Sequence, residues 1–265
     1  MRFNNKVNTK DLFSLKDKLA IVIGGMGKIG TPICEALLES EATLIICSSN
    51  KKNLNLAYKK FRNFNKKIHT FKMDQSQPLQ INSFIKKIKK EFKIPDVLFN
   101  SAVNRPMKKY IKDTYKNFDK SMEINARGLF LLNRGFGDLM KLQKSGSIIN
   151  ISSIYGVVAP DPNIYTNSKI NTEPDYPFIK GGTIAMTKYF ASYYAKYNIR
   201  YNVLVPGGLF NDQDKSFVSN YCKKVPLSRM AYPNDIKGPA IFLASDASSY
   251  ITGSSVFVDG GYTIL

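Results

Sequence analysis

Two pairs of tyrosine and lysine, each with its members four positions apart, stand close together in the chain: Tyr165 with Lys169, and Tyr176 with Lys180. On a helix, residues at this spacing share one face, so the ammonium group would lie beside the phenol. A neighbouring cation stabilises the phenolate and lowers the pKa of a tyrosine from its ordinary value of about 10. Such a tyrosine can exchange a proton with an alcohol or a carbonyl oxygen.

The surroundings of Tyr176 predict a helix. After Lys180 the chain has no proline up to Tyr197, and one stripe can be formed by Ile184, Thr187, Phe190, Ala191 and Tyr194. Pro177 would fall in the first turn, where a missing N–H costs little. Tyr165 instead lies among asparagines and is followed by Pro174, which would end a helix just begun. Because roughly two such pairs are expected by chance, this context decides: Tyr176 is the predicted chemical residue and Tyr165 a loop residue.

The composition limits the classes of protein that remain. A chain of 265 residues with 43% hydrophobic content can bury a substantial core. No apolar run is long enough to span a bilayer, and the first residues lack the apolar region of a signal peptide. The three scattered cysteines and the single histidine favour neither disulfides nor a metal site. We expect a cytoplasmic protein that holds no metal.

The formal net charge of +19 leaves two interpretations open. Strongly basic proteins often bind nucleic acid or membrane surfaces. Here the lysines are spread through the chain in short pairs, and neither an arginine-rich helix nor a platform of stacking aromatic residues accompanies them. We therefore expect a solvated basic surface, with no nucleic-acid or membrane partner. A local patch can still attract an anionic substrate.

Short apolar runs alternate with longer helical patterns along the chain. Strands are predicted at 19–23, 43–47, 67–73, 96–99, 147–151, 200–205 and 255–258, and helices at 28–39, 51–61, 79–92, 118–141 and 234–244, with another from about Tyr176. Such alternation predicts an α/β fold with a doubly wound, mostly parallel sheet of about seven strands and helices on both faces. Since no repeat or linker is visible, we expect residues 1–265 to form a single domain with an N-terminal extension at about 1–14.

The first predicted strand leads into Gly24-Gly25-Met26-Gly27-Lys28-Ile29-Gly30 and then into a helix. Glycines allow a tight turn and close approach of a ligand to the backbone, while a helix N-terminus attracts phosphate. The strand before and the helix after favour a nucleotide cradle over a simple turn. We expect Gly24, Gly27, Lys28, Ile29 and Gly30 to hold the pyrophosphate of a dinucleotide.

Further motifs follow in order. They are Asp74 after the third strand, Asn100-Ser-Ala-Val103 after the fourth, Ile124-Asn125-Ala-Arg-Gly128, Asn150-Ile-Ser-Ser153, Tyr176 with Lys180-Gly-Gly, Pro206-Gly-Gly208, Ile251-Thr-Gly253 and Asp259-Gly-Gly261. From about Leu15 to the C-terminus, this ordered set resembles the short-chain dehydrogenase/reductase family. The resemblance implies a Rossmann-like fold, a nicotinamide cofactor and a homo-dimer or homo-tetramer. It also implies cofactor contacts from Asp74, Asn100, Ala102, Tyr176, Lys180, Pro206 and Gly207.

The same resemblance implies hydride transfer with acid–base catalysis. Tyr176 would exchange a proton with the substrate oxygen, while Lys180 would lower the pKa of Tyr176 and hold the nicotinamide ribose. Ser153 would donate a hydrogen bond to the substrate oxygen where charge develops, and Asn125 would position a water that relays protons to Lys180. Each residue also has a structural alternative: a packed aromatic for Tyr176, a strand-end hydroxyl for Ser153 and a capping amide for Asn125.

The chain departs from the family pattern at several positions. Ile23 replaces a threonine, Lys28 stands where a glycine is common, and Val103 replaces a glycine on the adenine side. Tyr176 lies 23 positions after Ser153, whereas the family spacing is about 13, so roughly ten additional residues lie within about 159–175. Loops of this kind often carry specificity, so we expect this insertion to line the substrate site; a decorative loop is the alternative.

The end of the second predicted strand bears on the choice between NAD and NADP. NAD-selective proteins of this type generally have an acid there, which accepts a hydrogen bond from the ribose 2′-OH. This chain has Cys47-Ser48-Ser49-Asn50-Lys51-Lys52, with no acid and two cations. Ser48 and Ser49, with these lysines and Lys28, would suit a 2′-phosphate. We expect NADP(H) rather than NAD(H); the alternative is that the two lysines only begin a solvated helix.

Cations are also placed where the mouth of the site is expected: Arg105, Lys108 and Lys109 after the fourth strand, and Lys215 after Pro206. This cationic rim favours a small anionic or polyhydroxylated substrate, such as a phosphorylated or nucleotide-linked sugar. The glycine turn, the long loop and the Tyr-Pro-x-Ile-Lys-Gly-Gly motif are similar to those of reductases associated with bacterial surface or flagellar sugar modification. Two further functions stay open: reduction of a lipid or acyl-carrier ketone, and cofactor sensing without catalysis.

Overall fold

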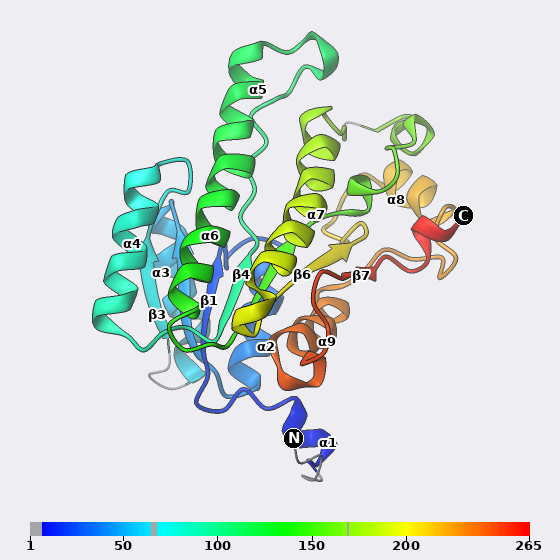
Figure 1. Ribbon diagram of the computed structural model, residues 1–265. Helices are drawn as coiled ribbons and strands as arrows, with labels where there is room; N and C mark the ends of the chain where they lie inside the picture. Colours follow the sequence, from blue (N-terminus) through cyan, green and yellow to red (C-terminus); the bar gives the residue numbers. More distant parts are fainter. Residues whose placement is uncertain (1–6, 65–67, 169) are drawn as a thin grey trace.

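The computed structural model describes residues 7–64, 68–168 and 170–265. Within these ranges seven strands form one parallel sheet in the order β3-β2-β1-β4-β5-β6-β7 (Figure 1). The strands are β1 (Leu19–Ile23), β2 (Thr43–Ser48), β3 (Ile68–Lys72), β4 (Val97–Asn100), β5 (Gly146–Ile151), β6 (Ile199–Pro206) and β7 (Ser255–Val258). The chain runs outward from β1 to β3 and returns on the other side of β1 to β4, so the predicted doubly wound fold is confirmed. Ligands of such sheets bind at the carboxyl ends of the strands beside this switch point.

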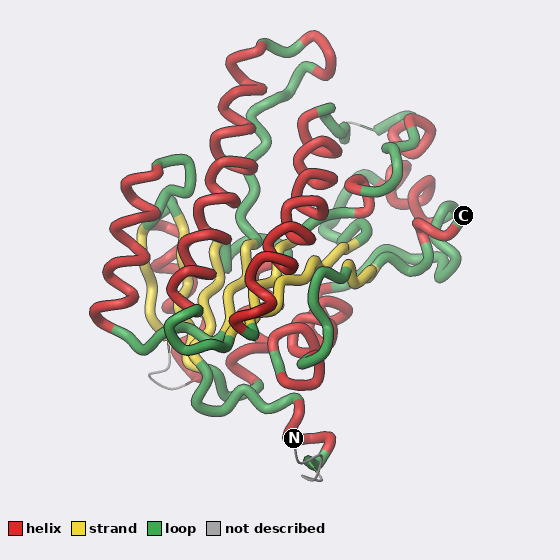
Figure 2. Tube along the Cα trace, viewed as in Figure 1, coloured by secondary structure: helices red, strands yellow, loops and turns green. Residues whose placement is uncertain are grey.

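Helices cover both faces of the sheet, as predicted. They are α1 (Thr9–Leu12), α2 (Gly30–Glu39), α3 (Lys51–Phe61), α4 (Pro78–Glu91), α5 (Tyr115–Met122), α6 (Gly128–Met140), α7 (Asp175–Tyr194), α8 (Lys215–Cys222) and α9 (Pro233–Ala244). Apolar residues of α2, α3 and α9 pack on one face and those of α4, α6 and α7 on the other, and Figure 2 shows the strands between these layers. Along β1, Ala20 and Val22 enter the first core, whereas Leu19, Ile21 and Ile23 enter the second. Alternation between two buried faces explains the unbroken apolar run of this strand.

Helix α7 forms as the sequence predicted. It starts at Asp175, an acid in the first turn that suits the positive end of the helix dipole. Pro177 also falls in the first turn, where its ring breaks no helical hydrogen bond. The face that carries Thr187, Phe190 and Tyr194 is buried. This face packs α7 against β6 and fixes its N-terminus at the carboxyl edge of the sheet.

Three segments differ from the prediction. The helix predicted at 118–141 is divided into α5 and α6 by a π-helical turn, Glu123–Arg127. Helix α8, in the segment after β6, was not predicted. Within the predicted N-terminal extension the structure describes α1, while residues 1–6 lie outside the described part of the chain, as does residue 67 of the predicted third strand.

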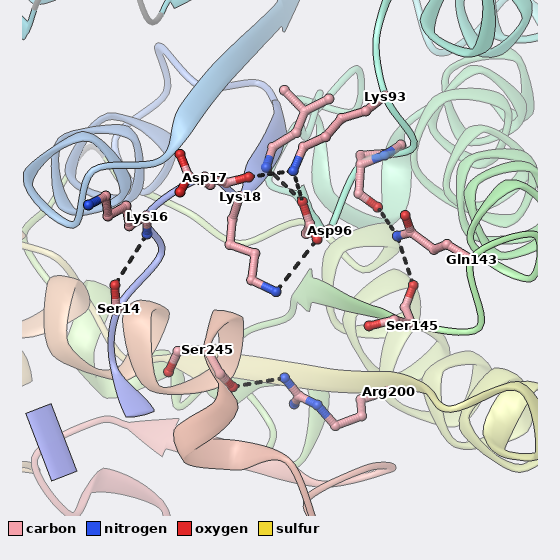
Figure 3. Close-up of polar contacts among 12 residues, drawn as sticks. Ser14, Lys16, Asp17, Lys18, Lys93, Asp96, Gln143, Ser145, Arg200 and Ser245 are labelled. Atoms are coloured by element: carbon pink, nitrogen blue, oxygen red, sulfur yellow. Dashed lines mark hydrogen bonds and ion pairs between the residues drawn. The ribbon is translucent and has the colours of Figure 1, made fainter. Parts of the chain in front are cut away.

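Polar contacts fasten the amino ends of the strands, the edge opposite the predicted site (Figure 3). The carboxylate of Asp96, just before β4, forms ion pairs with the Nζ of Lys93 at 3.0 Å and the Nζ of Lys18 at 3.7 Å. On β6, Arg200 donates to the main-chain oxygen of Ser245 at 3.1 Å. These contacts join β1, β4, β6 and the end of α9, so charged residues here are occupied in holding the sheet together.

Candidate active site

Two adjoining cavities lie at the carboxyl ends of the central strands. The larger, of about 830 Å³, is lined by Gly24, Gly27 and the end of β2, and is termed the glycine-loop cleft. The smaller, of about 390 Å³, is lined by Ser153, Tyr176 and Lys180 and is termed the tyrosine cavity. The two share the following lining residues: Lys28, Ile29, Ser101, Val103 and Arg105. A ligand in the cleft can therefore reach into the cavity.

The glycine-loop cleft has the geometry of a phosphate cradle. Gly24 has a φ of +77°, and a Cβ there would lie 2.6 Å from the Cα of Ala102. A Cβ on Gly30 would lie 2.2 Å from the carbonyl oxygen of Gly24. At the start of α2, Ile29 provides no side-chain cap, so the leading amides of the helix have no side-chain acceptor. This turn and the uncapped helix end fit a dinucleotide pyrophosphate.

The remaining predicted cofactor residues fall into two groups. Ser48, Ser49, Asp74 and Ala102 line the glycine-loop cleft together with Lys28, and Pro206 and Gly207 line the tyrosine cavity. Asn100 lines neither cavity as the structure describes them. Its buried Nδ2 donates to Asn150 at 2.8 Å, so its side chain instead joins β4 to β5. The contact of Asn100 with a cofactor stays a prediction.

Tyr176 lies with Lys180 and Ser153 in the tyrosine cavity. Burial alone would raise the pKa of Tyr176, but the positive charges of Lys180 and Arg105 and hydrogen bonding by Ser153 lower that pKa below its ordinary value. The Nζ of Lys180 lies 5.5 Å from the centroid of the tyrosine ring. A tyrosine with these neighbours can accept a proton from an alcohol or donate one to a carbonyl.

Lys180 is buried and fixed by the end of β5. Its Nζ donates to the main-chain oxygen of Ile151 at 2.8 Å, and its own main-chain oxygen accepts from the Ser152 hydroxyl at 2.8 Å. Burial lowers the pKa of Lys180, and the negative charge of an ionised Tyr176 opposes that shift. Ser152, which the sequence did not single out, thus anchors α7, while its neighbour Ser153 faces the phenol.

Asn125 lies in the π-helical turn, a distortion that is frequent at functional sites. Its Nδ2 donates to the main-chain oxygen of Asn104 at 2.6 Å, and its Oδ1 accepts from the main-chain N–H of Asn104 at 3.0 Å. Its Nδ2 also donates to Ser121, which donates in turn to the buried carboxylate of Asp175. The side chain therefore fixes the loop after β4, while its predicted water relay to Lys180 stays a prediction.

The predicted insertion lies beside Tyr176 and under α8. Tyr165 and Thr172 line the tyrosine cavity, together with Ile170 and Asn171. The hydroxyl of Tyr165 lies 2.8 Å from that of Tyr155 and 2.6 Å from that of Thr172. Burial raises the pKa of Tyr165, in contrast to that of Tyr176. Lys169, the lysine of the alternative pair, lies outside the described residues.

Arg105 makes a contact that the sequence did not reveal. Its guanidinium carbon lies 3.7 Å from the centroid of the Tyr176 ring, so the group covers the face of the tyrosine. Of the four cations of the predicted rim, Arg105 is the one that lines the described cavities. The sequence showed only that a cation follows β4. Whether that cation contacts α7 depends on the conformation of the loop after β4, which the sequence does not reveal.

Across the three described ranges, no group of three His, Cys, Asp or Glu side chains lies together as possible metal ligands. In the same ranges, no helix has both the length and the apolar character that a membrane crossing needs.

Comparison with known proteins gives the family. A family model described as enoyl-(acyl carrier protein) reductase matches residues 26–263. The chain is 29% identical over 253 residues to the post-translational flagellin modification protein A of Campylobacter coli, covering 94% of this chain and 99% of that protein. A solved short-chain dehydrogenase from Leptospira borgpetersenii with bound NAD+ is 32% identical, with a TM-score of 0.87 and 99% of both chains covered.

A second solved structure is similar in fold. A gluconate 5-dehydrogenase from Burkholderia cenocepacia, in complex with NADP and tartrate, has a TM-score of 0.88 and 26% identity, with 97% of this chain and 100% of that chain covered. The family model spans most of the chain, and the relatives cover it nearly end to end. As its motifs predicted, the chain belongs to the short-chain dehydrogenase/reductase family, whose members are NAD(P)-dependent oxidoreductases of CH–OH groups.

Proposed function

We propose that the protein is an NADP(H)-dependent oxidoreductase that interconverts an alcohol and a carbonyl on a small, sugar-derived substrate. One observation carries the proposal: Tyr176, Lys180 and Ser153 converge on a cavity that shares a wall with the glycine-loop cleft. A dinucleotide in the cleft can therefore place its reactive end beside the phenol. When bound, NADP(H) donates or accepts the hydride.

The roles of the protein groups follow from their positions. Tyr176 exchanges a proton with the substrate oxygen, and the buried ammonium of Lys180 stabilises its phenolate form. Ser153 interacts with the same phenol, so its hydroxyl can donate to a substrate oxygen placed between the two. Asn125 holds the loop after β4 and is proposed to position the water that returns a proton to Lys180.

The preference for NADP(H) rests on the end of β2. Ser48 and Ser49 line the glycine-loop cleft, and Lys28 lines it from the glycine turn. Asn50 caps α3 by accepting from the amide of Lys52 at 2.8 Å, which places two lysines in the first turn of that helix. Hydroxyls and cations without an acid in this segment suit a 2′-phosphate, whereas an NAD-selective site needs a carboxylate.

A sugar-derived substrate is supported by both the cavity and the relatives. Hydroxyl and amide groups of Thr172, Asn171 and Gln213 line the tyrosine cavity and can bind several substrate hydroxyls. The Campylobacter coli relative is named for flagellin modification, and the Burkholderia cenocepacia structure for gluconate oxidation, with tartrate bound. Gluconate and tartrate are hydroxylated acids, and Arg105, one cation of the predicted rim, lines the tyrosine cavity.

Reduction of an acyl-carrier ketone is the second candidate. The description of the matching family model names an acyl-carrier protein substrate, and Ile154, Phe217 and Met230 give the tyrosine cavity an apolar wall. An acyl chain could pack on this wall. The polar residues of the insertion that line the same cavity, Asn171 and Thr172, favour the sugar instead.

A substrate screen tests the two candidates directly. Purified protein is mixed with NADPH or NADH and with sugar phosphates, nucleotide sugars, keto-sugar acids or acyl thioesters, and cofactor absorbance is followed. Turnover of sugar derivatives with NADPH supports the proposal. Turnover of thioesters alone would transfer the assignment to the second candidate. Cofactor binding without any turnover would indicate the sensor that the sequence left open.

Assembly and location complete the proposal. Helix α7 exposes Phe178, Tyr189 and Tyr193 over at least half of each side chain, and such aromatic surface commonly packs against another subunit. We propose a homo-dimer or homo-tetramer, testable by light scattering, in the cytoplasm, where the free cysteines stay reduced.

A further inference from the structure

We propose that Arg105 is a displaceable cover on Tyr176, which an oxyanion carried by the substrate draws away. The site then accepts acidic or phosphorylated sugar derivatives in preference to neutral ones. This inference rests on the proposed function and specifies the substrate class of the same site. Its physical basis is the position of one guanidinium group and the charge balance of the tyrosine cavity.

The contact between Arg105 and Tyr176 is closer than comparable contacts in the described chain. Arg134 lies 5.2 Å from the ring centroid of Phe130, and Arg229 lies 5.6 Å from that of Tyr232, whereas Arg105 lies 3.7 Å from that of Tyr176. A guanidinium at this distance occupies space over the reacting residue. A substrate oxygen must reach the phenol, so substrate and guanidinium compete for the same region.

Arg105 is placed to move. Residues 101–108 adopt neither helix nor strand, and Arg105 is exposed. Among the residues that the structure describes, the ion pairs do not include Arg105. Its guanidinium also forms a hydrogen bond with Tyr176. A guanidinium has five N–H donors, so others can engage an anion, and a carboxylate or a phosphate can accept two parallel hydrogen bonds from them.

The charges around the tyrosine cavity favour such an anion. Lys28, Arg105 and Lys180 all line it, and its described lining residues include no aspartate or glutamate. Lys180 is buried, whereas Lys28 and Arg105 are exposed. A buried positive charge without a counterion attracts an anionic ligand more strongly than a neutral one. A substrate oxyanion would neutralise part of this charge at the moment when it engages Arg105.

Displacement of Arg105 also changes the phenol. Four neighbours face Tyr176: Lys180 from α7, Ser153 from the end of β5, Tyr165 from the insertion, and Arg105 from the loop after β4. When an anion engages Arg105, Lys180 is left as the cation that lowers the pKa of the phenol. The proton affinity of Tyr176 then rises in the substrate complex, which favours the protonated form that would donate a proton to a carbonyl oxygen.

Matched substrates test the cover. Gluconate, sorbitol and sorbitol 6-phosphate share a carbon chain and differ in charge, and each is assayed with NADP+ and wild-type, Arg105→Met and Arg105→Lys protein. At a pH above the kcat/KM midpoints of all three proteins, we expect Arg105→Met to lower kcat/KM for gluconate by about 100-fold and for sorbitol by less than about threefold, with Arg105→Lys intermediate. The phosphate ester shows whether the cover responds to phosphate as well. Arg134→Met, which removes an arginine from a ring outside both cavities, is the control and should leave all three substrates unaffected.

Two further readouts separate this inference from the proposed function. In wild type, the pH midpoint of kcat should lie above that of kcat/KM, whereas the two should coincide in Arg105→Met. If Arg105→Met lowers kcat/KM equally for gluconate and sorbitol, or for neither, the proposal that Arg105 is a displaceable cover is wrong. If wild type oxidises none of the three, the proposed substrate class is wrong. Calorimetric binding of gluconate to the enzyme with NADP+ then still tests Arg105, and equal affinity in wild type and Arg105→Met would refute its role.

Discussion

The ammonium group of Lys180 donates a 2.8 Å hydrogen bond to the main-chain oxygen of Ile151, the last residue of β5. This bond ties the first turns of α7 to the central sheet and holds the cation 5.5 Å from the centroid of the Tyr176 ring. Because the lysine is buried, solvent screens its charge poorly. The pairing of phenol and ammonium is therefore imposed by the fold rather than by two flexible side chains.

The pH dependence of alcohol oxidation should report this pairing. Oxidation requires Tyr176 as phenolate, so kcat/KM is high above the pKa of Tyr176 and falls as the pH drops through it. Although burial raises that pKa, Lys180 and Arg105 hold it below its ordinary value, so the wild-type midpoint should lie below about 10. Lys180→Met should move the midpoint upward by about one unit or more. Lys188→Met, an exposed position on the same helix, should leave it unchanged, and a midpoint that stays fixed in Lys180→Met would exclude Lys180 as the tuning cation.

Two tyrosine variants distinguish the chemical residue from its neighbour. Tyr176→Phe removes the proton donor and should lower kcat by about 1,000-fold while NADPH binding, measured by fluorescence, is retained. Tyr165→Phe removes only hydrogen bonds to Tyr155 and Thr172 and should change kcat by less than about tenfold. The reverse ranking would assign the chemistry to Tyr165.

The fold was largely predictable, because it depends on local patterns. Each strand begins and ends within one residue of the predicted positions, because buried apolar runs are flanked by polar or glycine-rich segments. The π-helical turn was missed because it continues the helical apolar pattern and differs from an α-helix only in hydrogen bonding. The position of Arg105 was also beyond the sequence, since a loop after β4 meets α7 only through tertiary folding. Motif order placed Ser153, Tyr176 and Lys180 in one family site, but their catalytic roles stay predictions.

Cofactor choice can be tested at the end of β2. Ser49→Asp places a carboxylate where the proposed 2′-phosphate would bind, and like charges repel. The Kd for NADP+ should therefore rise by about 100-fold, whereas that for NAD+ should change little or fall. Ser145→Asp introduces the same charge at the opposite edge of the sheet and serves as the control (Figure 3). Equal weakening of NADP+ and NAD+ by Ser49→Asp would contradict a phosphate subsite there.

Two glycine-to-alanine variants should have opposite effects on stability. Gly30 opens α2, and a Cβ there would lie 2.2 Å from the carbonyl oxygen of Gly24, a main-chain atom that cannot rotate away. The glycine turn must then shift, so Gly30→Ala should weaken NADP+ binding by about tenfold or more and lower the melting temperature.

Gly182 lies inside α7, where a Cβ would meet no atom within 4 Å. Gly182→Ala should therefore raise the free energy of unfolding by about 0.5–1 kcal/mol, because alanine restricts the unfolded chain and favours the helix. Urea titrations and cofactor binding on both variants check this contrast. Unchanged NADP+ affinity in Gly30→Ala would show that the cofactor does not depend on the close approach of Gly30 to Gly24.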